Sequence, residues 1–222
     1  EHDLTVQEVI LSLERNNNVH LIDQLMLRKA IELLRGNGDP DCRLGINLSA
    51  ISFGMAEHFD ELCAQLRSLP EPVRKRLVME ITETAIIEKP ELWSMKLQQL
   101  RDLGLKIAID DFGVGFASIA YLFRFQADYL KLDLSYSQRL HDNNVDALVQ
   151  FLLSYASHNN CRLILEGIET EEQLQVWRQQ GVNLFQGYLF HDCIAVPCAI
   201  NSGRRRAEDR RSTDDYRSTD NS

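Results

Sequence analysis

Residues 77–111, LVMEITETAIIEKPELWSMKLQQLRDLGLKIAIDD, contain two short apolar runs separated by a longer segment with helical spacing. The runs at 77–83 and 106–111 are nearly continuous in hydrophobicity, which is typical of parallel strands that are buried on both faces. The segment between them starts near Pro90 and ends before Gly104, as the ends of a helix often do. This stretch therefore predicts a strand, a helix and a second strand parallel to the first.

The same alternation extends in both directions along the chain. Further strands are predicted at 44–49, 129–133, 162–166 and 184–189. Helices are predicted at 21–34, 59–69, 91–103, 118–123, 145–157 and 171–180. Thr170 and Gln173 fit a capping box at the start of the last helix. The repeated pattern indicates a parallel α/β sheet or barrel. Six strands are too few for a closed eight-stranded barrel, so either the sheet is open or strands are missing at one end.

Length and composition place the chain among soluble globular proteins. It has 222 residues, of which 44% are hydrophobic and 26% are charged, which suffices for one large domain with a substantial core. We assign residues 1–200 to that domain. Residues 203–222 combine mixed charges with almost no apolar side chains, so we expect them to be a disordered tail. The formal net charge of -9 disfavours binding to a nucleic acid polymer.

Cysteine and histidine spacing points away from disulfides and zinc. The five cysteines are widely spaced, form no CxxC pair and are odd in number, so we expect free thiols in a reducing compartment. The six histidines form no HxxxH or HxH pair, and we expect them on helices or at the surface. The sequence contains no run of eighteen apolar residues. We therefore expect a cytoplasmic domain, which leaves open a membrane anchor elsewhere in the full-length protein.

Polar and charged side chains recur at the carboxyl end of every predicted strand. They are Asn47, Glu80, Glu83, Asp110, Asp111, Lys131, Asp133, Glu166, Glu169 and Gln186. A single acid of this kind is explained by a helix cap, but a set on six strands is not. The carboxyl ends of barrel strands form the catalytic face. Converging oxygen ligands suit Mg²⁺ or Mn²⁺, and two such ions can clamp a phosphodiester and activate water. The pattern predicts metal-assisted phosphoryl chemistry without identifying the substrate.

Six motifs in a fixed order give a more specific interpretation. They are NLSAISF (47–53), MEITETAI (79–86), IDDFGVGFASIAYL (109–122), DYLKLDLS (128–135), LEGIETEEQL (165–174) and FQGYLF (185–190). In order and spacing they resemble the motifs of EAL domains, over about residues 4–190. The resemblance implies a modified (β/α)8 TIM-like barrel that hydrolyses cyclic di-GMP to linear pGpG in bacterial signalling. It also implies two Mg²⁺ or Mn²⁺ ions, a homodimer, and a sensory or GGDEF-type domain upstream.

The resemblance also implies roles for individual residues. Asn47, Glu80 and Asp110 match metal ligands, and Asp111 matches a ligand of the second metal, with Asp110 between the two ions. Lys131 matches the lysine that holds the attacking water.

The remaining matched residues surround this centre. Asp133 and Glu166 match acids that complete the metal–water network. Glu83 matches the glutamate that anchors the loop after the DDFG strand. Glu169 and Gln186 match residues near the active site and the bound dinucleotide.

Two departures from the family pattern affect these expectations. The Glu-Ala-Leu strand, whose glutamate is a metal ligand in the family, is not found, and residues 4–34 resemble the segment after it. Two missing strands and six predicted ones give eight, so we expect a domain that is truncated at its N-terminus relative to the family. Val114 and Phe116 replace the usual Thr and Tyr of DDFGTGY.

These departures leave a second hypothesis for function. A catalytically inactive EAL domain would serve as a receptor for cyclic di-GMP or as a protein-docking module. Such domains usually lose several acids, whereas every remaining acidic position that we can match is filled here. The sequence therefore favours the enzyme.

Overall fold

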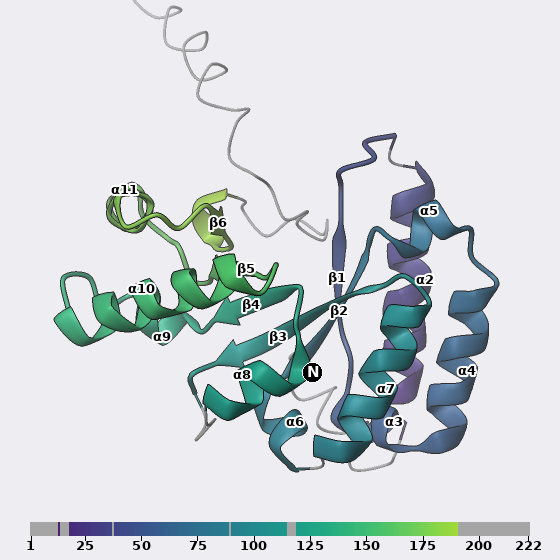
Figure 1. Cartoon of the computed structure of the whole chain (residues 1–222). Helices are drawn as coiled ribbons and strands as arrows, with labels where there is room; N and C mark the ends of the chain where they lie inside the picture. The colour runs from purple at the N-terminus through teal and green to yellow at the C-terminus, as the bar shows by residue number, and fades with distance from the viewer. Residues whose placement is uncertain (1–12, 14–17, 37, 89, 115–118, 191–222) are drawn as a thin grey trace, which may run out of the picture.

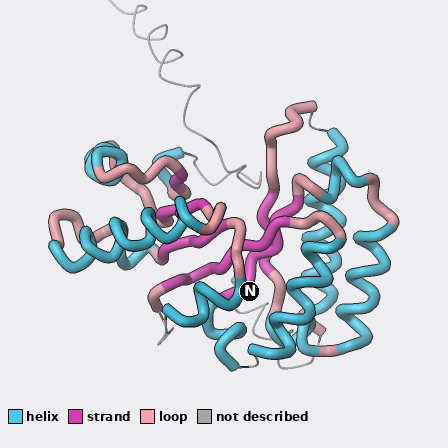
Figure 2. The backbone as a smooth tube through the Cα atoms, in the orientation of Figure 1, coloured by secondary structure: helices cyan, strands magenta, loops and turns pink. Residues whose placement is uncertain are grey.

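The computed structural model of the chain describes residues 13, 18–36, 38–88, 90–114 and 119–190. Within them, six strands form one parallel sheet in the order β1-β2-β3-β4-β5-β6, so each strand pairs with the next along the chain. The sheet curls into a half-barrel with helices on its outer side (Figures 1 and 2). The strands are β1 (Leu44–Asn47), β2 (Leu77–Thr82), β3 (Lys106–Phe112), β4 (Tyr129–Leu132), β5 (Arg162–Leu165) and β6 (Leu184–Phe185). The predicted parallel α/β class is confirmed.

Helices fill the connections between the strands. They are α2 (His20–Gly36), α3 (Ala50–Gly54), α4 (Ala56–Arg67), α5 (Glu71–Arg74), α6 (Glu83–Glu88), α7 (Pro90–Asp102), α8 (Ile119–Phe125), α9 (Leu134–Ser137), α10 (Asn143–His158), α11 (Glu171–Gln179) and the 3-10 helix η1 (Tyr188–Phe190). Helix α2 packs on β1, α7 on β3 and α10 on β5. All six predicted helices are present within a few residues of their expected ends, although residue 118, the expected start of α8, lies outside the described residues.

The predicted helix signals act as expected. Helix α7 begins at Pro90, and Gly104 and Gly181 follow helices with φ of +88° and +100°, a conformation that glycine adopts without a steric penalty. The Thr170–Gln173 capping box is present at the start of α11, with Gln173 N donating to Thr170 Oγ1 over 3.2 Å.

The last strand was predicted too long. The sequence predicts a strand over 184–189, but β6 contains only Leu184–Phe185 and η1 follows. Gly187 allows the chain to leave the strand here, because the Ile168 carbonyl oxygen lies 2.1 Å from where a Cβ at this position would sit. The chain turns against the Ile168 backbone there, and Leu189 N donates to Ile168 O over 3.0 Å.

The two faces of the sheet bury different clusters. Side chains on the outer face, such as Leu77, Met79 and Ile81 of β2, belong to the large core that the helices cover. A separate inner cluster contains one residue from each of five strands: Val78, Ala108, Tyr129, Ile164 and Leu184. Because both faces are apolar over most of each strand, the strands have the continuous hydrophobicity seen in the sequence.

Several residues that the sequence analysis covers lie outside the described part of the chain. They are the predicted tail at 203–222, His2, His191, Cys193, Cys198 and Phe116. Within the described part of the chain, no helix is long and apolar enough to cross a membrane.

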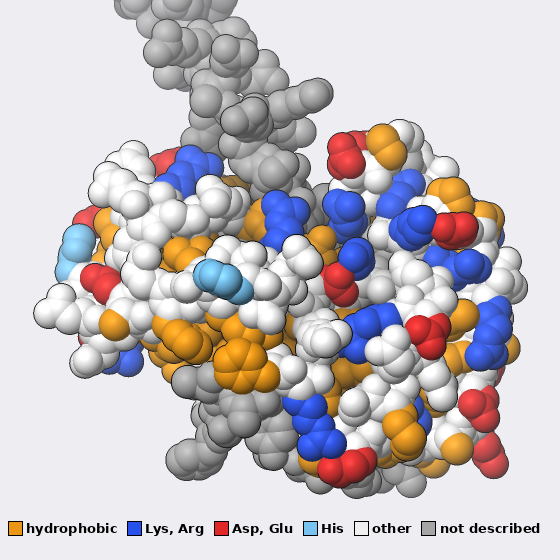
Figure 3. Space-filling view, viewed as in Figure 1, with side chains coloured by type: hydrophobic (Ala, Val, Ile, Leu, Met, Phe, Trp, Pro, Cys, Tyr) orange, Lys and Arg blue, Asp and Glu red, His pale blue; other side chains and the backbone are white. Residues whose placement is uncertain are grey.

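On the face shown in Figure 3, acidic and basic side chains are interspersed, and hydrophobic side chains gather over α8 and α10. Phe123 and Phe151 are among the exposed apolar residues of those helices.

A candidate metal-binding active site on the inner face

The inner face of the sheet changes from apolar to charged within one pleat. Each member of the inner cluster is followed two residues later by a polar side chain, and these are Glu80, Asp110, Lys131, Glu166 and Gln186. Side chains two residues apart lie on the same face of a strand. The charged layer therefore sits directly above the inner apolar cluster, at the carboxyl ends of the strands.

Strand β1 follows the same rule with a glycine in the apolar layer. Gly45 pairs with Val78, and Asn47, two residues later, pairs with Glu80. The Oε1 atom of Glu80 lies 1.8 Å from the position that a Cβ at Gly45 would occupy. Glycine is therefore required at this position for the Glu80 carboxylate to occupy its place on the inner face. Gly45 was not among the predicted site residues, although its position two residues before Asn47 was a signal.

Lys131 is the centre of the charged layer. Its Nζ atom lies 2.9 Å from Glu80 Oε2, 2.8 Å from Asp110 Oδ1 and 2.7 Å from Glu166 Oε1. The lysine is only 3% exposed. Burial alone would lower its pKa, but the three carboxylates, Glu80 first, outweigh burial and raise it. Lys131 is therefore a buried cation that donates hydrogen bonds and stays protonated across the physiological range.

The carboxylates around this cation are poorly stabilised as anions. Burial raises the pKa of Glu166 to about 7, against the opposing effect of Lys131. Burial also raises the pKa of Glu80, where the negative charges of Asp110 and Asp111 add to the shift. One ammonium thus faces an excess of acids, a condition that a bound cation would relieve.

Asp111 joins the cluster through an irregularity in β3. In a regular strand, consecutive side chains point to opposite faces, which would direct Asp111 away from Asp110. The pairing of β3 with β4 shifts register between Ile109 and Phe112, and Asp111 has a φ of +52°. As a result, oxygens of Asp110, Asp111 and Glu166 lie within 4.8 Å of one another, close enough to hold a metal ion. Burial and the nearby Asp110 raise the pKa of Asp111.

The turn after β3 is held from two sides. Glu83, at the start of α6 and 4% exposed, accepts a hydrogen bond from Gly113 N at 2.6 Å. Tyr136 of α9 donates a hydrogen bond from its hydroxyl to Gly113 O at 2.8 Å. Both flanking contacts therefore meet on one residue, two positions after Asp111.

The other predicted site residues lie around the cluster. Asp133 is half-buried and caps α9, where its Oδ1 accepts from Ser135 N at 2.9 Å. Its negative charge acts on Asp111. Glu169 and Gln186 are exposed at the ends of β5 and β6, and Glu169 N donates to Gln173 Oε1 over 2.7 Å. Asn47 is exposed at the end of β1.

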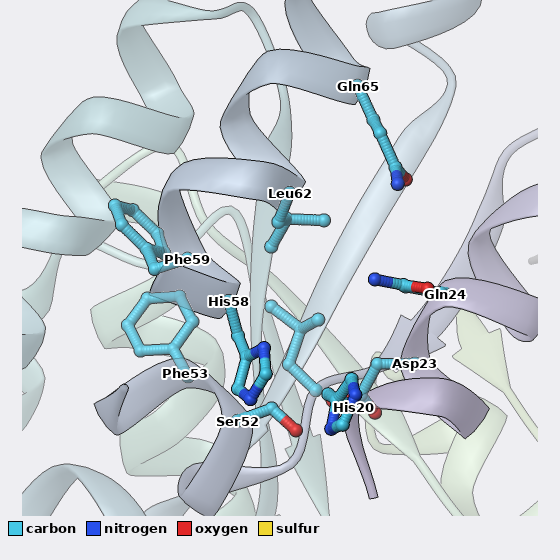
Figure 4. Close-up of a pocket in the computed structure, with 10 residues that line it drawn as sticks. His20, Asp23, Gln24, Ser52, Phe53, His58, Phe59, Leu62 and Gln65 are labelled. Carbon is cyan, nitrogen blue, oxygen red and sulfur yellow. The ribbon is translucent and has the colours of Figure 1, made fainter. Parts of the chain in front are cut away.

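Two of the described histidines, His20 and His58, lie away from these acids. His20 of α2 and His58 of α4 stack with ring centroids 4.0 Å apart and line a pocket in the helix layer (Figure 4). That pocket also contains Phe53 and Phe59 of the large outer core, so it lies on the opposite side of the sheet from the charged layer. His158 is on α10, as expected of a helix histidine.

Comparison with known proteins decides which family has this arrangement. The family model for the EAL domain matches residues 1–192. The chain belongs to the EAL domain family. This confirms the resemblance that the six motifs carried, and it accounts for the curled parallel sheet with acids at its carboxyl end.

Curated EAL-domain relatives are similar over most of this chain. MucR of Pseudomonas aeruginosa, a bifunctional diguanylate cyclase/cyclic di-GMP phosphodiesterase, is 32% identical over 195 residues, which cover 85% of this chain and 28% of MucR. The cyclic di-GMP phosphodiesterase PdeB of Shewanella oneidensis is 33% identical over 188 residues, 83% of this chain and 22% of PdeB. This EAL domain thus spans about a quarter of the length of the curated relatives it matches.

Solved EAL structures share the fold. The phosphodiesterase PaMucR in complex with c-di-GMP superposes with a TM-score of 0.73 at 29% identity, covering 84% of this chain and 76% of that one. The manganese/cyclic-di-GMP complex of BlrP1 from Klebsiella pneumoniae gives a TM-score of 0.67 at 27% identity, covering 82% and 46%.

Proposed function

We propose that this EAL domain hydrolyses cyclic di-GMP to linear pGpG with the help of two divalent ions, Mg²⁺ or Mn²⁺. The observation that carries the proposal is the placement of Lys131, whose ammonium contacts Glu80, Asp110 and Glu166 at 2.7–2.9 Å. A buried cation among several acids on the catalytic face of a parallel α/β sheet is suited to phosphate chemistry.

The residues present fit a divalent ion. The cluster of Asp110, Asp111 and Glu166 offers carboxylate oxygens within 4.8 Å of one another, and oxygen ligands are those that Mg²⁺ and Mn²⁺ prefer. We assign Glu80 and Asn47 to the same site because the backbone of Asn47, at the end of β1, is paired in register with that of Glu80 in β2. Burial raises the pKa values of Glu80, Asp111 and Glu166, and a bound cation would favour the charged form of each carboxylate.

The chain's own residues have separate tasks in the proposed reaction. When bound, the ions would lower the pKa of a coordinated water and neutralise charge on the phosphate. We assign to Lys131 the orientation of the attacking water and the stabilisation of negative charge that develops on the phosphate. The water releases a proton as its oxygen forms a bond to phosphorus, the bond from phosphorus to the 3′ oxygen breaks, and the leaving oxygen takes up a proton. The products are a free 3′ hydroxyl and a 5′ phosphate, as in linear pGpG.

Residues at the rim are assigned to the dinucleotide and to the metal–water network. Gln186 and Glu169 are exposed beyond the ends of β6 and β5, and we assign them to substrate binding. Asp133 lies near enough to influence Asp111, and with Glu166 we assign it to the network around the water. Glu83 serves as the anchor of the turn after β3 through its bond to Gly113 N.

Turnover of cyclic di-GMP tests this function. We would assay the chain as it stands and extended upstream through the two further strands that the family resemblance implies, with Mn²⁺, Mg²⁺ or EDTA, and separate the products chromatographically. Formation of pGpG that stops with EDTA is the expected result. Tight binding without turnover would instead indicate the inactive receptor, and neither binding nor turnover would indicate a protein-docking module.

We also propose partners for this domain, namely a further domain in the same protein and a second copy of the chain. MucR is named as bifunctional and its matched part is 28% of its length, which supports a GGDEF-type or sensory domain upstream in the full-length protein. A homodimer and a cytoplasmic location for this domain remain predictions, and sedimentation of the purified protein would test the first of them.

A further inference from the structure

Helix α9 is a single turn that connects three of the strand ends that carry the site. It follows β4 directly and is capped by Asp133. Ser137 Oγ donates to Leu134 O at 2.9 Å and lies 3.4 Å from Gly167 O. Gly167 comes directly after Glu166, the residue that follows β5. From the same helix, Tyr136 extends in the opposite direction, to the turn after β3.

The contact between Tyr136 and Gly113 combines a hydrogen bond with close packing. The hydroxyl donates to Gly113 O at 2.8 Å. A Cβ at Gly113 would lie 2.6 Å from Cε2 of the Tyr136 ring, and the φ of Gly113 is +98°. The ring therefore packs directly against a glycine in a conformation that other residues rarely adopt.

The same turn determines where Asp111 points. Val114 N donates to Asp111 O at 3.3 Å, which closes a four-residue turn with Gly113 in third position. Asp111 itself has an unfavourable φ of +52° and faces the like charge of Asp110, which with burial raises its pKa. Both effects oppose the conformation that brings Asp111 to the cluster, so contacts outside the turn must stabilise it.

We propose that Tyr136 is a positioning residue, whose hydroxyl holds the Gly113 turn so that Asp111 stays with Asp110 and Glu166 in the geometry that binds metal. Glu83 holds the NH of Gly113, and Tyr136 holds its carbonyl. The inference rests on the proposed metal-dependent function but concerns a residue outside the ligand set. Without the hydroxyl, the turn samples other conformations, and apparent metal affinity falls by the fraction of molecules that keep the competent one.

The test compares Tyr136→Phe with Tyr155→Phe. Tyr155 is a matched control, because its hydroxyl also donates to a backbone carbonyl, Leu122 O at 2.6 Å, from α10 to α8. Mn²⁺ binding is measured directly from the signal of the free ion in electron paramagnetic resonance. Amide exchange of peptides spanning residues 106–114 is measured on the metal-free protein.

Tyr136→Phe should raise the apparent Kd for Mn²⁺ about fivefold, the factor that corresponds to the loss of one ordinary hydrogen bond, and should speed exchange in the β3 turn. Tyr155→Phe should leave both unchanged even if it lowers the melting temperature as much. Equal Mn²⁺ affinity in wild type and Tyr136→Phe would overturn the inference while leaving the proposed function intact. Absence of Mn²⁺ binding in the wild type would overturn both, and the exchange data would then show only whether the hydroxyl orders the turn.

Discussion

The Glu80 carboxylate occupies the space that a side chain at Gly45 would need, with Oε1 1.8 Å from the position of a Cβ. The two residues are on the neighbouring strands β1 and β2. Strands β2 to β6 each contribute one side chain to the inner apolar layer, whereas β1 has Gly45 at this level. An acid in the charged layer thus depends on the absence of a side chain in the layer below.

Gly45→Ala should displace Glu80 from Lys131. We expect a loss of about 1–3 kcal/mol in the free energy of unfolding, the usual range for overpacking, together with weaker Mn²⁺ binding. Urea denaturation and metal titration would measure the two effects. Gly54→Ala is the control, because a Cβ at that helical position meets nothing within 4 Å. If Gly45→Ala behaved like Gly54→Ala in both measurements, Gly45 would not be making room for Glu80.

Lys131→Met should destabilise the metal-free protein at neutral pH. The substitution leaves Glu80, Asp110 and Glu166 near one another without the cation that contacts all three. Removing one partner of a buried ion pair costs roughly 3–5 kcal/mol. The loss should shrink at pH 5, because burial raises the pKa of Glu166 to about 7 and this carboxyl is then protonated. Urea denaturation at both pH values would measure the loss.

Lys106→Met provides the comparison for an exposed pair. Lys106 lies 2.6 Å from Asp128, with its side chain 44% exposed, and such pairs contribute about 0–1 kcal/mol. A loss for Lys131→Met no larger than that for Lys106→Met would contradict the central role of the buried lysine.

Stability of the metal-free protein should fall as pH rises toward neutrality. The pKa of Glu166 is about 7 in the folded chain against an ordinary 4.5, so between these values the folded state binds more protons than the unfolded state. The free energy of unfolding therefore decreases as pH rises through this window, by at most ~3 kcal/mol from Glu166. The raised pKa values of Glu80 and Asp111 act in the same direction.

Unfolding free energies measured between pH 4.5 and 7.5 in EDTA would reveal this dependence. Glu166→Gln should flatten it, whereas Glu172→Gln, on the exposed side of α11, should not. A pH dependence that is the same in Glu166→Gln as in the wild type would show that Glu166 is not the group responsible.

Much of the fold was predictable because it depends on local signals. Continuous apolar runs gave the strands of a two-sided parallel sheet, and capping residues gave the ends of the helices. The short helices α3, α5, α6 and α9 were not predicted, since one turn or little more carries no periodicity. Helices α3 and α9 are started instead by the capping side chains of Ser49 and Asp133.

Part of the site followed from the two-residue period of the strands, and part did not. Glu80, Asp110 and Lys131 share the inner face because each lies two residues after a member of the inner apolar cluster. Asp111 shares that face only through the register shift and its φ of +52°, which depend on tertiary contacts. Tyr136 was missed for the same reason, since its partner Gly113 is 23 residues away in sequence.

The most direct test of the central claim compares cyclic di-GMP turnover in Mn²⁺ by the wild type and by Asp110→Asn. Both proteins are extended upstream as described above, and circular dichroism checks that each is folded. Asp110 is 8% exposed and contacts Lys131 at 2.8 Å, and an amide there keeps the shape but removes the charge. We predict that the wild type forms pGpG and that Asp110→Asn forms none while remaining folded. Undiminished hydrolysis by a folded Asp110→Asn protein would contradict the metal site proposed here.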